Sequence, residues 1–192
     1  MALTKLNARS ATALDATVLT GNLPAISGAS LTGLSAGITE ADQWRVTSSF
    51  ANSSNGVAEV ITSNWERADE HFDKIGTGLS QSSGVFSFPS TGIYWITIHG
   101  FFYPTGANSD IRIQLRQTPD DGSNYYTRAE GMNGASGADR PETISCSCIL
   151  DVTDTSNYKF TIRTIGTTAS NFWRGDTGAQ KFGLTCIRLG DT

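Results

Sequence analysis

From about residue 42 onward, apolar and polar residues alternate in short segments, and turn residues separate these segments at intervals of about ten residues. The clearest segment is Ile111–Gln117, where Ile111, Ile113 and Leu115 alternate with polar side chains. A period of two places successive side chains on opposite faces of a β-strand, so each segment predicts a strand with one buried face. About eight to ten such strands predict an all-β fold, a β-sandwich of the jelly-roll type.

The longest of these segments, Ile93–Tyr103, is apolar on both faces, so we expect it at the centre of a sheet. The other expected strands are Gln43–Phe50, Val85–Phe88, Ile111–Gln117, Tyr125–Glu130, Thr143–Val152, Tyr158–Ile165 and Phe182–Leu189. Residues 57–75 are ambiguous, because Ile61 and Trp65 have a helical spacing while β-branched residues nearby disfavour a helix. We interpret this segment as a strand near Val60–Trp65 followed by a loop.

Residues 1–40 differ in composition from the rest of the chain, because they contain none of its aromatic residues and few charged ones. The apolar residues of this stretch include Leu14, Leu19, Leu23, Ile26, Leu31 and Leu34. Such a stretch buries too little apolar surface to offset its conformational entropy alone. We therefore expect residues 1–41 to form an extended, mostly irregular anchor that becomes ordered against partner subunits or a larger assembly. Residues 42–192 would form a head domain.

The charge pattern excludes several classes of partner. The net charge is −4, and no basic block occurs that would attract nucleic acid. No run of about 18 apolar residues occurs, so we expect no insertion into a membrane. The first residues lack the apolar stretch of a secretory signal, so we expect the protein to be assembled in a cytoplasm.

The three cysteines do not suggest a disulfide framework, because their number is odd and no secretion signal accompanies them. Cys146 and Cys148 are two residues apart on an expected strand and therefore share a face. A metal site would need a second pair of ligands at a suitable spacing. We interpret both cysteines as small core residues and predict no metal site there.

The sequence contains no arrangement of residues that is typical of an enzyme active site. His71 and His99 do not form a zinc-binding array, and no serine has the strand–turn–helix surroundings of a nucleophile. The acidic residues between 66 and 73 could supply a pair of glycosidase carboxylates, but they read more simply as a solvated turn. We therefore expect a protein without enzymatic activity, and an enzyme that degrades polysaccharide is the less favoured alternative.

The stretch at residues 23–34 reads LPAISGASLTGL. It resembles the N-terminal and linker segments of bacteriophage tail-fibre and other virion appendage proteins. The resemblance covers about 12 to 20 residues of low-complexity sequence. It implies a structural protein of the virion.

A second motif lies at the start of the expected central strand. The positions that match it are Gly84, Phe86, Pro89, Gly92 and Tyr94. They resemble the G-x-F-x-x-P-x-x-G-x-Y-x-F hallmark of tumour-necrosis-factor-like jelly rolls and the related globular heads of complement proteins, with Ile96 where that family often has Phe. The closing segment Phe182–Ile187 is similar to the last strand of the family. The resemblance implies two five-stranded sheets and a compact homotrimer around a mostly apolar axis.

The excess of aromatic surface on the central strand independently favours contact with other subunits. The expected residues of the core and trimer interface are Tyr94, Ile96, Ile98, Phe101 and Phe102. Aromatic residues beside Gly- and Asn-rich loops are candidates to stack on a glycan or to contact a receptor. They are Tyr103, Tyr125, Tyr126, Phe172 and Trp173. For Trp173 the alternative is a plug in the core or an interface.

The turn Asp120-Asp121-Gly122 could offer oxygen ligands to calcium, and the jelly-roll resemblance makes calcium more plausible. The simpler interpretation is an Asp-Gly turn, with no cofactor.

Together these features predict a homotrimeric appendage of a bacteriophage virion, a short fibre or spike docked by its N-terminal segment. The head would be exposed and could attach to a host surface glycan. The alternative is a capsid decoration protein that stabilises the phage head. Other virion proteins of the capsid or tail would be its partners.

Overall fold

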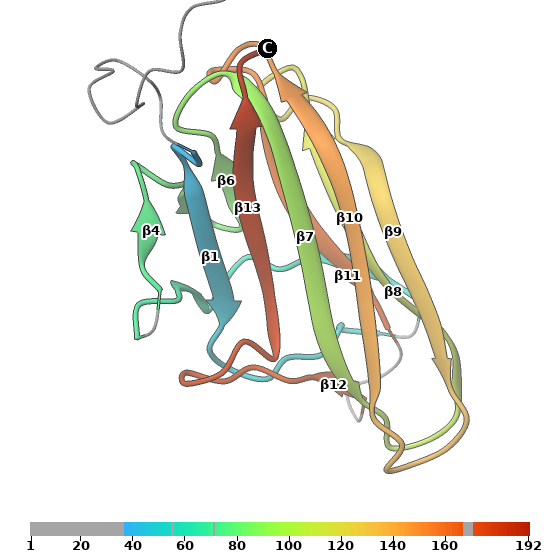
Figure 1. The fold of residues 1–192 in the computed structure, drawn as a ribbon. Helices are drawn as coiled ribbons and strands as arrows, with labels where there is room; N and C mark the ends of the chain where they lie inside the picture. Colours follow the sequence, from blue (N-terminus) through green and yellow to red (C-terminus); the bar gives the residue numbers. More distant parts are fainter. Residues whose placement is uncertain (1–36, 55, 71, 167–170) are drawn as a thin grey trace, which may run out of the picture. The chain divides into compact units, whose positions relative to one another are not determined.

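The computed structural model describes residues 37–192 except 55, 71 and 167–170, and it shows strands and no helix in this part of the chain (Figure 1). The strands are β1 (Ala41–Val46), β2 (Ala58–Val60), β3 (Trp65–Arg67), β4 (Lys74–Ile75), β5 (Ser80–Ser82), β6 (Val85–Ser87), β7 (Gly92–Tyr103), β8 (Asn108–Thr118), β9 (Tyr126–Ala135), β10 (Glu142–Val152), β11 (Lys159–Ile165), β12 (Phe172–Trp173) and β13 (Phe182–Gly190). Nothing described is a helix of the length and hydropathy that a membrane span needs. The six leucine and isoleucine residues expected in the anchor lie outside the described residues.

The strands form two antiparallel sheets that face each other (Figure 1). One sheet has the order β10-β7-β13-β1-β3, with β12 beside β7 and β4 beside β1. The other has the order β5-β6-β11-β8-β9, with β2 beside β11. Each main path contains five strands, and β7 lies inside its sheet between β10 and β13. This arrangement confirms the predicted all-β sandwich.

The core fills the space between the sheets with the apolar side chains of alternate strand positions. Phe86 is at its centre and fully buried. Its ring stacks on Phe160 at 5.0 Å, and it meets the rings of Trp44 and Trp65 edge-on at 5.6 and 5.1 Å. Such aromatic contacts add to the stability that burial of the rings provides.

The glycine-and-aromatic motif at residues 84–94 has a structural role. Gly84 adopts a φ of +80° in the turn between β5 and β6, and a Cβ there would collide with the backbone of Ile61. The hydroxyl of Tyr94 donates a 2.9 Å hydrogen bond to the carbonyl oxygen of Ser90, which anchors the turn before β7. The motif therefore fixes the entrance to the central strand.

The region at 57–75 differs from the expected single strand and loop. It forms three short strands, β2, β3 and β4, which join different sheets. Asn64 has a φ of +62° and reverses the chain just before β3. Trp65 then turns towards the core, where its ring also lies 6.3 Å from that of Phe182. The residues whose spacing resembled a helix, Ile61 directly after β2 and Trp65 on β3, reach the core from opposite sheets.

Candidate self-association surface

Most of the residues expected at the core and trimer interface lie inside one subunit. Tyr94, Ile96, Ile98 and Phe102 are buried between the two sheets, so they have no surface to offer to a partner. Their burial agrees with the core position that was one of the two expected for them, and it leaves them no part in an interface. Phe101 points the other way and is half-buried on the outer face of β7.

A row of apolar side chains crosses the outer face of the seven-stranded sheet instead. Ile75, Ala41, Ile187, Trp95 and Ile149 are consecutive register partners across β4, β1, β13, β7 and β10. We call these five residues the apolar row. The side chains of register partners lie on the same face of a sheet, so the row is continuous over the whole width.

The apolar row is exposed along much of its length. Ile75 is 42%, Trp95 37% and Ile149 63% exposed, whereas Ala41 is buried between its neighbours. Leu189, beyond a register shift in β13, is exposed as well. Large apolar side chains that adjoin one another on a surface usually mark a contact with another molecule.

Beside the apolar row lies a row of small polar side chains. Gln43, Thr185, Thr97 and Ser147 are register partners two residues further along their strands. Nε2 of Gln43 donates a 3.2 Å hydrogen bond to Oγ1 of Thr185. No member of this row is charged, so another surface could approach it without an unpaired charge becoming buried.

Charged side chains flank these two rows: Asp151 lies beside the apolar row, and Arg45 lies in the row beyond the small polar side chains. The guanidinium of Arg45 is buried and contacts Glu66 at 2.9 Å and Asp69 at 3.1 Å. His99 lies on the same face, and its Nε2 donates to the carbonyl oxygen of Gln180 at 2.7 Å. Glu66 and Asp69 thus both form ion pairs with Arg45. This structural use of the two carboxylates does not favour a catalytic role for them.

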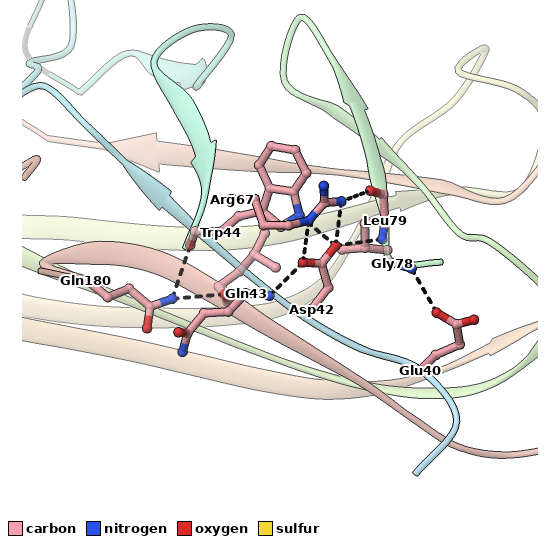
Figure 2. A network of polar contacts seen from close by, with 9 residues as sticks. Glu40, Asp42, Gln43, Trp44, Arg67, Gly78, Leu79 and Gln180 are labelled. Carbon is pink, nitrogen blue, oxygen red and sulfur yellow. Dashed lines mark hydrogen bonds and ion pairs between the residues drawn. The ribbon is translucent and has the colours of Figure 1, made fainter. Parts of the chain in front are cut away.

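A buried polar network fixes the edge of this sheet from the inner side (Figure 2). Asp42 accepts hydrogen bonds from Nε and Nη2 of Arg67 at 2.9 and 3.0 Å, from Nε1 of Trp44 at 2.9 Å, and from the backbone N–H of Leu79 at 2.7 Å. The guanidinium of Arg67 also lies over the Trp44 ring, 4.7 Å from its centroid. Hydrogen bonding to Asp42 raises the pKa of Arg67.

The same network holds the loop that follows β4. The carboxylate of Glu40 accepts hydrogen bonds from the backbone N–H groups of Thr77 and Gly78 at 3.1 and 2.9 Å. Glu40 and Asp42 therefore bind consecutive N–H groups of one loop. This positions β4, and with it Ile75 at the end of the apolar row.

The five aromatic residues expected to contact a glycan do not form one site. The rings of Tyr103 and Phe172 stack at 5.5 Å where β12 pairs with β7, and Arg174 lies 5.8 Å from both ring centroids. Tyr126 begins β9 and Tyr125 directly precedes it, so both lie beside the end of β8. Tyr103 precedes the start of β8, at the opposite end of that strand.

Trp173 is fully buried and contacts the rings of Phe102 and Phe182. The expectation that it contacts a glycan is therefore corrected, and it is the core plug that the alternative described.

The Asp120-Asp121-Gly122 turn uses its carboxylates within the protein. Asp120 accepts from Oγ1 of Thr118 at 2.6 Å and from the backbone N–H and side-chain amide of Asn124 at 2.8 and 2.7 Å. These hydrogen bonds lower the pKa of Asp120. Asp121 forms an ion pair with Lys159. No group of three or more His, Cys, Asp or Glu side chains suited to a metal ion occurs in the described part of the chain.

The apolar row could not be recognised in the sequence as a set. Its members come from five strands, and only the register brings them together. The signal that the sequence does carry is the outward position of Trp95 on a strand that is apolar on both faces.

Comparison with known proteins gives a fold but no family. No protein-family model and no curated protein sequence match the chain. Among solved structures, Eiger TNF from S. frugiperda aligns over 79% of this chain and 93% of its own, with 15% identity and a TM-score of 0.56.

Murine APRIL aligns over 78% of this chain and 98% of its own, with 9% identity and a TM-score of 0.57. The globular domain of zebrafish complement 1qA was also found, with 10% identity, a TM-score of 0.47, and coverage of 81% of this chain and 100% of its own. The similarity to Eiger TNF and APRIL shows that the described domain has the jelly-roll fold of tumour-necrosis-factor-like proteins, as predicted.

Proposed function

We propose that the chain is a non-enzymatic structural component of a bacteriophage virion, a short fibre or spike built from three copies. The heads associate through the outer face of the seven-stranded sheet, and the N-terminal segment that precedes β1 docks the trimer on the capsid or tail. Copies of the head would then expose their loops, which can contact the host surface.

The apolar row carries this proposal. A monomer gains nothing from a continuous band of isoleucine and tryptophan on the outside of its sheet, whereas an interface gains stability by removing such side chains from water. A stable interface buries about 800 Å² on each partner. The apolar row, the small polar row beside it and Leu189 span the width of the sheet and provide a face of suitable character.

The virion role is supported by the N-terminal sequence. The stretch at residues 23–34 resembles linkers of phage appendages, and its composition suits a segment that becomes ordered only on a partner. The head needs no catalytic site for such a role.

Deletion of residues 1–36, which leaves Glu40 and β1 intact, tests the docking step. Particles assembled in the presence of the full-length chain should retain this protein after purification, while particles assembled in the presence of residues 37–192 alone should lack it. The truncated chain must still have the β-sheet circular dichroism spectrum of the full-length protein. A truncated head that co-purifies with particles as well as the full-length chain would refute docking through this segment. Copy number then separates the two structural alternatives, because decoration of a capsid needs many more copies than a fibre.

A further inference from the structure

The outer face of the six-stranded sheet carries positive side chains around one hydroxyl group. Thr161 lies on β11, with Lys159 and Arg163 two residues away on either side and therefore on the same face. Arg116 of β8 is the register partner of Thr161. Same-face residues along a strand are about 7 Å apart and neighbouring strands about 4.8 Å apart, so the three cationic side chains start around Thr161. We call these four residues the cationic cluster.

Two polar atoms of the cationic cluster are buried without a partner. Thr161 is only 3% exposed, and its Oγ1 makes no hydrogen bond. Nε of Arg116, on the facing strand, is also buried and makes none. Buried donors and acceptors are almost always paired in folded proteins, and an unpaired one costs stability. Two of the four such atoms in the described residues thus belong to register partners within the cationic cluster.

The arginines of the cluster are also not neutralised. Among the ion pairs of the described residues, none joins Arg116 or Arg163 to a carboxylate. Nε of Arg163 donates to Oε1 of Gln114 at 2.7 Å, and Nη2 of Arg116 donates to the carbonyl oxygen of Tyr125 at 2.6 Å. Burial, and then the nearby positive charge of Arg116, lower the pKa of Arg163.

The other charges of this face have protein partners. Glu130 contacts Arg112 at 3.6 Å and accepts a hydrogen bond from Gln114, and Arg112 is also paired with Asp110. Lys159 is paired with Asp121. Arg116 and Arg163 are thus two half-buried arginines on adjacent strands, in neighbouring rows of the same face, and no ion pair of the described residues neutralises them.

We propose that Arg116 and Arg163, with Lys159 and Thr161 beside them, bind an oxyanion group (a carboxylate, sulfate or phosphate) carried by an external ligand. Guanidinium groups bind such anions through paired, charge-assisted hydrogen bonds. An anion between them would relieve the repulsion of the two positive charges. The cationic cluster faces away from the seven-stranded sheet, so this inference does not depend on the proposed assembly.

Binding of sulfate tests this inference with the full-length protein. Sodium sulfate and dextran sulfate are titrated at constant ionic strength, with neutral dextran as a blank, and binding is followed by calorimetry and by the amide NMR shifts of β8 and β11. The double variant R116Q/R163Q removes both guanidinium groups. We expect it to weaken binding by about tenfold or more, since both groups make charge-assisted hydrogen bonds to the anion.

The variant K74Q/R140Q is the matched control, because it removes two positive charges from exposed positions outside the cationic cluster. It should bind as the wild type does, and the melting temperatures of both variants verify that they are folded.

Tighter binding of dextran sulfate than of sulfate would identify an anionic polymer as the ligand source, and equal binding per sulfate group would identify a free ion. Absence of sulfate binding by the wild type, or equal losses in the two variants, would overturn the proposal.

Discussion

Asp42 shows how one buried carboxylate can organise a sheet edge. It accepts hydrogen bonds from an arginine, a tryptophan and a backbone N–H group, and each of these donors comes from a different part of the chain. A buried charge is tolerated only when it is paired and hydrogen-bonded in this way. The sequence alone does not reveal this role, because an Asp between Ala41 and Gln43 looks like an ordinary polar position of a strand.

The Asp42→Asn variant should lower the free energy of unfolding by about 3 kcal/mol, because it leaves the guanidinium of Arg67 without its charged partner. Urea unfolding followed by tryptophan fluorescence measures this difference. Asp151→Asn is the matched control, since Asp151 is exposed on β10, away from Arg67, and the same chemical change there should cost less than about 0.5 kcal/mol. Equal effects of the two variants would mean that the network does not contribute to stability.

The cysteines should be chemically inert in the folded protein. Burial raises the pKa of the Cys146 thiol to about 11, and it raises the pKa values of Cys148 and Cys186 as well. Only the thiolate reacts with alkylating agents, and a raised pKa leaves almost none of it near pH 8. Iodoacetamide at pH 8 should therefore modify the native protein much more slowly than the urea-unfolded chain. Mass spectrometry measures this by the number of alkylated cysteines at each time point. Rapid labelling of any of the three in the native state would contradict the burial described above.

Strands are the elements that the sequence predicts best here. Alternation correctly places Ile111, Ile113 and Leu115 in the core, and the apolar character of both faces of β7 correctly predicts its central position. These inferences succeed because the period of two depends only on local backbone geometry. What alternation cannot supply is which strand pairs with which, and in what register.

Short strands show the limit of such inference. Phe172 and Trp173 were expected on a loop, yet they pair with Tyr103 and Phe102 as β12. A strand of two residues is too short to show an alternation of apolar and polar side chains. It is defined only by its pairing with β7, which lies about 70 positions earlier in the chain. The same reason explains why the apolar row and the cationic cluster emerge only from the structure.

The two residues of β12 provide a matched test of its orientation. Trp173→Ala should lower the free energy of unfolding by about 3–5 kcal/mol, because it leaves a large cavity in the core. Phe172→Ala removes only the half-exposed ring that stacks on Tyr103 and should cost about 1 kcal/mol. Chemical denaturation of both variants measures the difference. The reverse order would contradict the assignment of Trp173 to the core.

At the scale of the whole molecule, the two outer faces of the sandwich differ in chemistry. The seven-stranded sheet presents the apolar row and small polar side chains, while the six-stranded sheet presents arginines and their partners. This division suits an assembly in which one face meets other copies and the opposite face meets the surroundings. It also means that variants on one face should leave the behaviour of the other face unchanged.

The mass of the full-length protein in solution tests the proposed association most directly. Sedimentation equilibrium at micromolar concentration should give three times the chain mass of 20.5 kDa. The variant W95E/I149E introduces two negative charges into the apolar row and should sediment as a single chain with an unchanged circular dichroism spectrum. An S80E/S82E control, at two exposed positions of β5 in the other sheet, should remain trimeric. A wild-type protein that sediments as a folded monomer, or a W95E/I149E variant that stays trimeric, would contradict the account.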